Sequence, residues 1–540
     1  MPRSRYQPPD RLIGATDFSK HPELCGSLNV VRLLKSQPWA WDELREACEL
    51  EIKWARKREP GHWELAAVAF VVSGHVDIKP WWANTTDDLW RECGFARRPS
   101  AATVHRRLRE LESVGDEFLN AAARIIQRCR MHDPRVMAHV HFDWTEDETH
   151  AALVHDCGPN DPCKRRSWSK SSRRRWGRNS ALRAPRAATS GAREHREAWN
   201  EEEETEAEQH ARDAGPESVQ HVTKGKRVKV GGCWYRTRDE EAGVRAYTSN
   251  GKVKRFWHGY YSGKAVCALT SGAIPSVDSA SIVECHLFPA LYDRVKAMAG
   301  RRPDTAIGDK GISVSSCFEH ATKNDTAPIF PWRANGANTQ RHDHARFDRH
   351  GVKRCEHCGG VMYQTRFSPN NGKPRLWFRC VFQLTPDCVG EQTIYCSEDW
   401  RALIPLPRTN ALYHELKESH QAYEGVHDYW RDRYKVASDT LANRPKAVGL
   451  DWHRLRANVA CLVDWLRIAA KAGWLGSART AQRPKGVRRK KDAGRKASMS
   501  VAKTRARLGL YSPYGPGAKK AGSGEETPPS RRPRGAPPGK

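Results

Sequence analysis

Hydrophobic side chains recur at helical spacing through the first quarter of the chain. Over residues 28–58 they lie three and four positions apart, and residues 61–76 form a second apolar segment. Residues 1–25, in contrast, are polar and contain proline, which is typical of a flexible lead-in. The pattern therefore predicts a helical region over residues 26–132.

Within that region, two short helices and a glycine turn predict a helix-turn-helix near residues 85–112. Either Thr85 or Thr86 can cap the first helix, and Gly94 opens the turn before the second. The expected shared core is Leu89, Phe95, Val104, Leu108 and Leu111. The expected DNA-facing side chains are Thr103, Arg106, Arg107 and Arg109. The alternative is an ordinary helical hairpin whose arginines are merely solvated.

Strand-like alternation begins near residue 136 and leads to a carboxylate. We expect residues 136–146 to deliver Asp143 at the end of a strand, and a second short apolar strand to run into Asp309. A lone aspartate after a strand is more often a turn former. Glycine on both sides of Asp309, however, lets backbone and metal approach closely.

A third acid lies on a predicted helix over residues 412–437. This helix carries Glu424, and Glu415 and Glu418 are rivals on the same helix. The side chains expected on the same face are His420, His427, Asp428 and Arg431. Two strand-end aspartates and a downstream helical glutamate suit a ribonuclease-H-like core, where neighbouring strands and a packed helix bring distant carboxylates to one edge.

The rest of the sheet is predicted from short alternating runs. Residues 149–155 resemble a returning strand, and further strands are expected within residues 233–269, followed by a helix over residues 279–299. Residues 156–230 contain a basic and then an acidic run without apolar periodicity, which predicts a solvated insertion. A last helix with a buried face is expected over residues 452–475.

Charge indicates a polyanionic partner. The 540 residues include 92 lysines and arginines against 63 aspartates and glutamates, a formal net charge of +29. Neutralised phosphates release condensed counterions, so double-stranded DNA is the favoured partner, although RNA would explain the charge equally well. Residues 476–540, a basic tail without hydrophobic pattern, carry about half of this charge and should bind nucleic acid without sequence preference. No apolar run is long enough to span a bilayer, so we expect no membrane partner and a cytoplasmic, nucleoid-associated protein.

Five of the 16 cysteines are gathered between Cys355 and Cys396, which predicts a zinc ribbon over residues 350–400. Structural zinc takes four ligands, so one thiol is left over. The expected ligands are Cys355, Cys358, Cys380 and Cys388, with Cys396 as a substitute. A redox pair is the alternative for a single Cys-x-x-Cys motif.

Asp143, Asp309 and Glu424, in this order and with these surroundings, resemble the DDE transposases of bacterial insertion sequences. The resemblance covers roughly residues 60–475; Trp144 departs from it, because relatives often have glycine there. It implies an α/β fold with a ribonuclease-H-like mixed sheet core over residues 133–475, an N-terminal helix-turn-helix region and an inserted zinc ribbon.

The resemblance also implies a reaction. Asp143 would ligate two Mg²⁺ or Mn²⁺ ions, with Asp309 and Glu424 each securing one, for DNA cleavage at element ends and strand transfer into target DNA. Arg431 and Lys435 would clamp phosphates, and assembly on paired ends suggests a homodimer. A nuclease without strand transfer and a non-catalytic, zinc-containing DNA-binding regulator are the alternatives.

Overall fold

The computed structural model describes most of the chain between residues 21 and 475. The described residues are 21, 24–51, 61–148, 153–155, 220–222, 227–230, 233–237, 239, 241–249, 252–332, 347–348, 350–368, 375–380, 382, 385–388, 391–395, 400–402, 406–436 and 449–475. The predicted lead-in, most of the charged insertion, Cys396 and the basic tail lie outside these residues.

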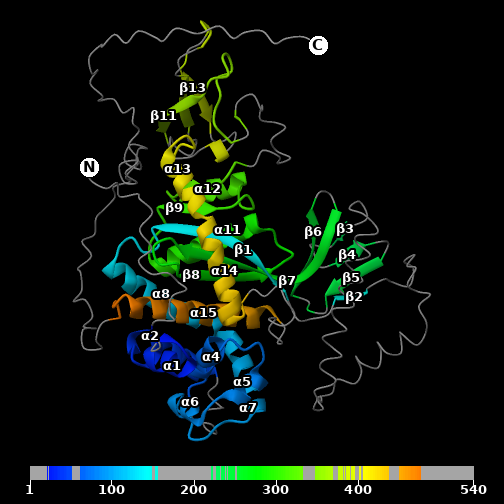
Figure 1. The fold of residues 1–540 in the computed structure, drawn as a ribbon, viewed down its shortest axis with the longest axis vertical. Coiled ribbons are helices and arrows are strands. Elements are labelled where there is room, and N and C mark those ends of the chain that lie inside the picture. The colour runs from blue at the N-terminus through cyan, green and yellow to red at the C-terminus, as the bar shows by residue number, and fades with distance from the viewer. Residues whose placement is uncertain are drawn as a thin grey trace, which may run out of the picture.

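A six-stranded mixed sheet forms the centre of the molecule (Figure 1). Its strands are β1 (His139–Glu148), β6 (Gly243–Ser249), β7 (Lys252–Cys267), β8 (Ala273–Ser279), β9 (Thr305–Gly308) and β10 (Ala327–Ile329). β7 pairs antiparallel with β1, β6 and β8, whereas β1, β9 and β10 run parallel to one another. The short parallel strands are buried throughout, as parallel strands covered on both faces usually are.

Helices connect and cover these strands. α11 (Glu284–Ala299) packs against β7 and β8, and α12 (Ser315–Lys323) lies between β9 and β10 in sequence. The predicted helix over residues 279–299 therefore begins later than expected, because Ser279 still pairs in β8. Ile282, which precedes α11, is 39% exposed.

The long helix α15 (Leu450–Lys471) joins the sheet to the N-terminal helices. It packs against β8 on one side and against α8 (Gly115–His132) and α4 (Trp63–Val72) on others. The helix is buried on more than the one predicted face, since every residue from Leu455 to Ala469 is buried. Its buried polar groups include His453, whose Nδ1 lies 2.8 Å from Asp147 Oδ2. Within the described residues, no helix is both long and hydrophobic enough to cross a bilayer.

The N-terminal region is helical, as the apolar pattern predicts. Its helices, besides α4 and α8, are α1 (Ser27–Lys35), α2 (Pro38–Glu51), α5 (Ile78–Asn84), α6 (Asp87–Glu92) and α7 (Ala101–Glu110). The Thr86 side chain caps α6 by accepting from Leu89 N, and Ser100 caps α7 by accepting from Thr103 N. All five expected core side chains of the two-helix unit are buried.

A separate four-stranded sheet corrects the prediction for the insertion. It consists of β2 (Leu153–His155), β3 (Gln220–Val222), β4 (Arg227–Val230) and β5 (Cys233–Thr237). The end of the predicted insertion is therefore paired strand rather than solvated chain. β2, expected to return beside β1, pairs antiparallel with β5 instead.

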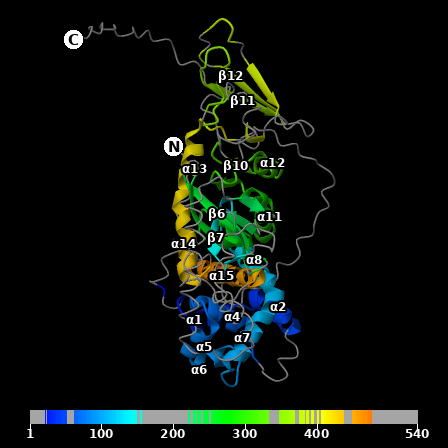
Figure 2. The ribbon, with the colours of Figure 1, turned by 90° about the vertical axis from the view of Figure 1, so that its right-hand side faces the viewer.

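The cysteine-rich segment forms a three-stranded sheet at one end of the molecule (Figures 1 and 2). Its strands are β11 (Met362–Ser368), β12 (Arg375–Cys380) and β13 (Glu391–Tyr395). The chain returns along the central sheet through α13 (Ala411–Ser419) and α14 (Gln421–Tyr434), which meet at His420 instead of forming the single predicted helix. α14 contacts β1, β7, α4 and α15.

Burial of a carboxyl on α15 predicts a pH-dependent stability. Burial is the main cause that raises the pKa of Asp464 to about 7, so the folded state holds this proton more tightly than the unfolded state. Its contribution to the free energy of unfolding is therefore largest below about pH 4 and falls as the pH rises to about 7, by on the order of 2–4 kcal/mol.

We expect Asp464→Asn to remove this part of the pH dependence, as measured by urea unfolding at pH 5 and pH 8. Asp451→Asn, at an exposed acid of the same helix, is the control. If the free energy of unfolding of Asp464→Asn differs between pH 5 and pH 8 as much as that of wild type, Asp464 is not the source of this pH dependence.

Candidate active site and metal centre

Asp143 and Asp309 lie side by side because two parallel strands part at this point. The ladder between β1 and β9 ends with the pair Phe142 and Gly308, and each aspartate is the next residue of its strand's chain. Asp309 therefore follows β9 as predicted. Asp143 does not end its strand, because β1 continues to Glu148 through its pairing with β7.

The loop after β9 holds Asp309 in a tight turn beside another acid. Asp309 Oδ1 accepts a hydrogen bond of 2.7 Å from Gly311 N. A Cβ at Gly311 would lie 1.9 Å from Glu284 Oε2 and 3.0 Å from Asp309 Oδ1, so a side chain there would displace the Glu284 carboxylate. Glu284 is the first residue of α11 and was not among the predicted site residues.

Burial and neighbouring acids together shift the pKa of Asp143. Burial is the main cause that raises the pKa of Asp143 to about 7, and the nearby carboxylates of Asp309 and Glu284 raise it further. The Trp144 backbone N–H, which donates to Asp143 Oδ1 at 2.9 Å, acts in the opposite direction. A cation bound between these acids would relieve their mutual repulsion.

The central sheet accommodates the large side chain of Trp144, next to the first acid. Its side chain is 8% exposed and crosses the neighbouring strand at Gly263, its partner in the ladder. A Cβ at Gly263 would lie 2.4 Å from Trp144 Nε1. Gly263 on β7 therefore leaves room for the Trp144 ring.

Two buried basic side chains stand behind Asp143. Lys264 pairs with Asp143 in the ladder between β1 and β7 and is fully buried. Its Nζ lies 3.0 Å from His427 Nδ1, and His427 Nε2 lies 3.3 Å from Asp143 Oδ2. Burial lowers the pKa of Lys264 to about 7 and lowers the pKa of His427 well below its ordinary value.

Glu424 lies in the first turn of α14 and is exposed. His420, at the junction of α13 and α14, is within electrostatic range of both Glu424 and Asp309, although burial dominates and lowers its pKa. The predicted common face is thus divided: His420 and His427 are buried, whereas Glu424 and Asp428 are exposed.

The three predicted acids do not form a preformed three-carboxylate cage. In the described part of the chain, the one group of three or more ligand-type side chains whose ligand atoms all lie within 4.8 Å of one another is a cysteine cluster. Any metal at Asp143, Asp309 and Glu424 would therefore require their side chains to move together.

The predicted phosphate-binding side chains differ in their surroundings. Arg431 Nη2 lies 3.4 Å from Thr145 Oγ1, and its Nη1 lies 3.3 Å from Asp428. Lys435 ends α14 with a positive φ of 52°. Arg431 therefore lies beside β1, two residues beyond Asp143.

On α7, Arg106 is exposed, whereas Thr103 is half-buried. Arg107 pairs with Glu110 at 2.7 Å and Arg109 with Glu112 at 2.8 Å. Arg106 is therefore the one of the three predicted arginines with no acidic partner in the described part of the chain.

Four thiols gather at the base of the cysteine-rich sheet. Cys355 Sγ lies 3.9 Å from Cys388 Sγ, and Cys358 Sγ lies 3.5 Å from Cys380 Sγ. Thiolates around a tetrahedral zinc, each about 2.3 Å from the metal, are roughly 3.8 Å apart. The predicted set Cys355, Cys358, Cys380 and Cys388 is thus brought together and can hold a structural metal such as zinc.

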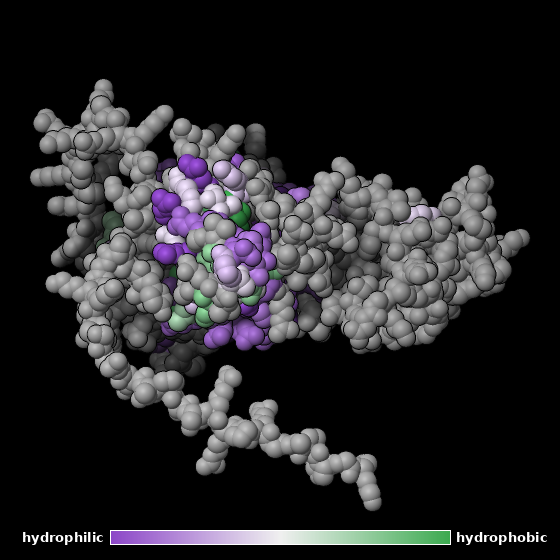
Figure 3. Space-filling model, turned by 90° about the horizontal axis from the view of Figure 1, so that it is seen from above, coloured by the Kyte–Doolittle hydropathy of each residue, from purple (hydrophilic) through white to green (hydrophobic). Residues whose placement is uncertain are grey.

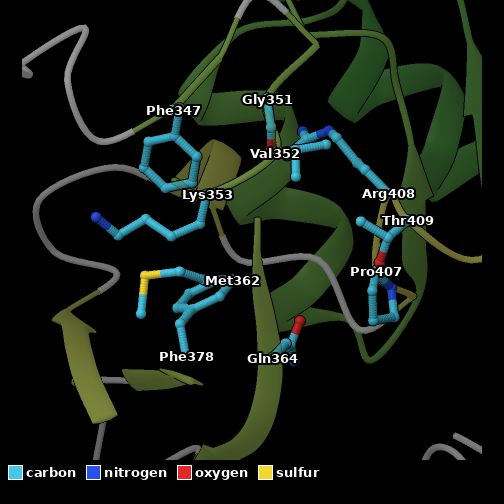
Figure 4. Close-up of a pocket in the computed structure, with 10 residues that line it drawn as sticks. All are labelled: Phe347, Gly351, Val352, Lys353, Met362, Gln364, Phe378, Pro407, Arg408 and Thr409. Atoms are coloured by element: carbon cyan, nitrogen blue, oxygen red, sulfur yellow. The ribbon is translucent and has the colours of Figure 1, made fainter. Parts of the chain in front are cut away.

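A small pocket lies between this sheet and the residues that precede α13, away from the acids. In Figure 4, Lys353, Met362 and Phe378 line one side of the pocket, and Pro407, Arg408 and Thr409 line the other. Seen from the end of the molecule that carries the cysteine-rich sheet, the described surface is mostly hydrophilic with smaller hydrophobic areas (Figure 3). None of the predicted catalytic or DNA-binding side chains lines the pocket.

Comparisons with known proteins add no relative. No protein-family model matches this sequence, and a search of characterised proteins finds none that is significantly similar. We therefore infer function from the arrangement of the side chains.

Metal removal tests the cysteine cluster. We expect the purified protein to contain about one zinc ion per chain and Cys380→Ser to lose it, because three thiolates close a tetrahedral site poorly. Elemental analysis measures the metal, and hydrogen exchange of β11 and β12 should increase when it is lost.

Cys25→Ser, at a half-buried thiol outside the cluster, is the matched control and should keep its zinc. Equal metal content in Cys380→Ser and the control would contradict the assignment.

Proposed function

We propose that this protein is a metal-dependent DNA phosphoryl-transfer enzyme, a DDE-type transposase that cleaves element ends and joins them to target DNA. The observation that carries the proposal is the pair Asp143 and Asp309, adjacent where β1 and β9 part. Paired carboxylates of this kind offer the hard oxygen ligands that Mg²⁺ prefers.

A ribonuclease-H-like core is part of this proposal. Three neighbouring strands, β7, β1 and β9, combine an antiparallel and a parallel pairing around the strand of the first acid. The second acid follows the parallel neighbour, and the third acid lies on a helix that contacts β1 and β7. This order of strand, strand and helix is what the resemblance requires.

The residues at the site fit divalent metal. Asp143 and Asp309 would be ligands. Burial and the neighbouring acids raise the pKa of Asp143, and a bound cation would neutralise the negative charge of these carboxylates. When bound, two Mg²⁺ ions would activate the attacking oxygen and stabilise the leaving oxygen of a phosphodiester. Arg431, beside Thr145 on β1, is positioned to contact a phosphate of the scissile strand.

The third ligand has two candidates. Glu424 fits the resemblance and shares with Asp309 an electrostatic influence on His420. Glu284 lies beside Asp309 at Gly311 and acts on Asp143 directly. We propose Glu424 as the third acid of the closed complex, with Glu284 as the acid that must be tested against it.

DNA recognition is proposed for α7, with Arg106 as its exposed cation. The basic composition supports a nucleic-acid partner, and Ser100 and the buried Val104 and Leu108 hold α7 in place. Two DNA ends would be joined by two copies of the chain. The cysteine cluster would hold Zn²⁺ as a structural ion.

Cleavage and strand transfer on a labelled duplex with the element's ends test the catalytic proposal. With Mg²⁺ or Mn²⁺, we expect wild type to nick and join, and Asp309→Asn to bind DNA but react more than about 100-fold more slowly. Even a residue that only hydrogen-bonds to a metal ligand typically contributes 10–100-fold to metal affinity or activity, so the loss of a ligand itself should cost more.

Asp293→Asn, an exposed acid on α11, is the control and should remain active. Nicking without joining would favour a nuclease. Binding by all proteins with no cleavage under any metal would refute catalysis and leave a DNA-binding regulator. In the same assay, loss of activity in Glu284→Gln with full activity in Glu424→Gln would identify Glu284, rather than Glu424, as the third metal ligand.

Salt dependence tests the DNA-binding helix. We expect Arg106→Ala to weaken binding to the element's ends and to reduce the slope of log affinity against log salt by about 1, because one phosphate contact is lost. Fluorescence anisotropy at several salt concentrations measures both quantities. Arg91→Ala, at an exposed arginine of α6, is the control. An effect equal to that of the control would rule out α7 as the DNA-facing helix.

A further inference from the structure

We propose that His427 is a positioning residue that orients the Asp143 carboxylate, and that Lys264 fixes the tautomer of the His427 ring. The inference rests on the proposed function for its consequence, metal binding, but its geometry stands independently. It concerns two side chains from two elements, β7 and α14, that converge on a third, β1.

The contacts form a short chain that ends at the acid. Lys264 Nζ lies 3.0 Å from His427 Nδ1, and His427 Nε2 lies 3.3 Å from Asp143 Oδ2. Lys264 and Asp143 are partners in the β1 and β7 ladder, so the sheet register fixes one end relative to the other. His427 reaches them from the second turn of α14.

Burial leaves the ring few alternatives. Lys264 is fully buried, and His427 is 4% exposed. His427 Nε2 is buried and makes no hydrogen bond among the described residues, and it lies 3.3 Å from Asp143 Oδ2. The ring of Trp430, centred 5.5 Å from Lys264 Nζ, covers the lysine on another side. Lys264 and the His427 ring are therefore shielded from solvent, whereas the Asp143 side chain is 26% exposed.

The chemistry of the donors determines the tautomer. When the Lys264 amine is protonated it has only hydrogens to offer, and Nδ1 is then the acceptor of the contact. A neutral imidazole with Nδ1 as acceptor carries its hydrogen on Nε2, the nitrogen that lies 3.3 Å from Asp143 Oδ2. Metal-binding carboxylates are commonly oriented by such hydrogen-bonding partners.

Both oxygens of Asp143 have a nitrogen nearby. Oδ1 accepts from the Trp144 backbone N–H at 2.9 Å, and Oδ2 faces the His427 ring at 3.3 Å. Each carboxylate oxygen has about two acceptor positions, so one on each remains for a metal ion. The pair on β7 and α14 therefore sets the plane of the carboxylate without occupying it.

The first measurement is the tautomer, by ¹⁵N NMR of histidine-labelled, metal-free protein. We expect His427 in wild type to carry its hydrogen on Nε2, and Lys264→Met to lose this preference. A hydrogen on Nδ1 in wild type, or an unchanged tautomer in Lys264→Met, would overturn the inference whether or not metal binds.

The second measurement is Mn²⁺ affinity, by electron paramagnetic resonance. We expect His427→Asn to bind Mn²⁺ about 10–100-fold more weakly than wild type, because the shorter amide cannot reach Oδ2. His427→Gln should recover most of the affinity, since its amide can place an N–H near the position of Nε2. His414→Asn, at an exposed histidine of α13, is the matched control.

The outcomes separate the two proposals. Equal loss of affinity in the Gln and Asn variants would mean a packing role only and would overturn the positioning role. If wild type binds no Mn²⁺, or Asp309→Asn binds it equally well, the proposed function fails, while the tautomer result still decides the inference. If Lys264→Met does not fold, the Mn²⁺ affinities of His427→Gln and His427→Asn decide whether His427 is a positioning residue.

Discussion

The parallel pairing of β1 with β9 is the interaction on which the candidate site depends. It ends at Phe142 and Gly308, so the following residues of both chains place two carboxylates side by side. Burial, and after it the nearby carboxylates of Asp309 and Glu284, raise the pKa of Asp143, so its charged form is costly here. β1 is paired with β7 on one side and with β9 on the other, and these pairings fix the backbone positions of the two aspartates.

Other polar side chains buried around the sheet also depend on fixed partners. Lys264 lies behind Asp143 without solvent, and α15 carries His453, Arg456 and Arg467 into the core. Each has a defined partner, such as Asp147 for His453 and the Tyr434 hydroxyl for Arg467. Buried charge is costly unless paired, so these groups determine which arrangement of α14, α15 and the sheet is allowed.

Features that depend on a few neighbouring residues were predictable from sequence. The caps at Thr86 and Ser100 satisfy free N–H groups at helix starts, and the apolar spacing of α7 specifies its buried face. The cysteine spacing likewise indicated the four clustered thiols. By contrast, the pairing of β2 with β5 and the break between α13 and α14 depend on distant segments, and the sequence pattern misled on both.

The sequence by itself determined the local chemistry: helices in the N-terminal region, an aspartate after β9, a glutamate on a helix and a metal-type cysteine cluster. Tertiary structure decided which groups share a site. Glu284 and Lys264 carry no local signal, because an acid at a helix start and a lysine in a strand are ordinary surface residues in sequence. Only the ladder register and the packing of α11 and α14 bring them to Asp143, and these are interactions between residues far apart in the chain.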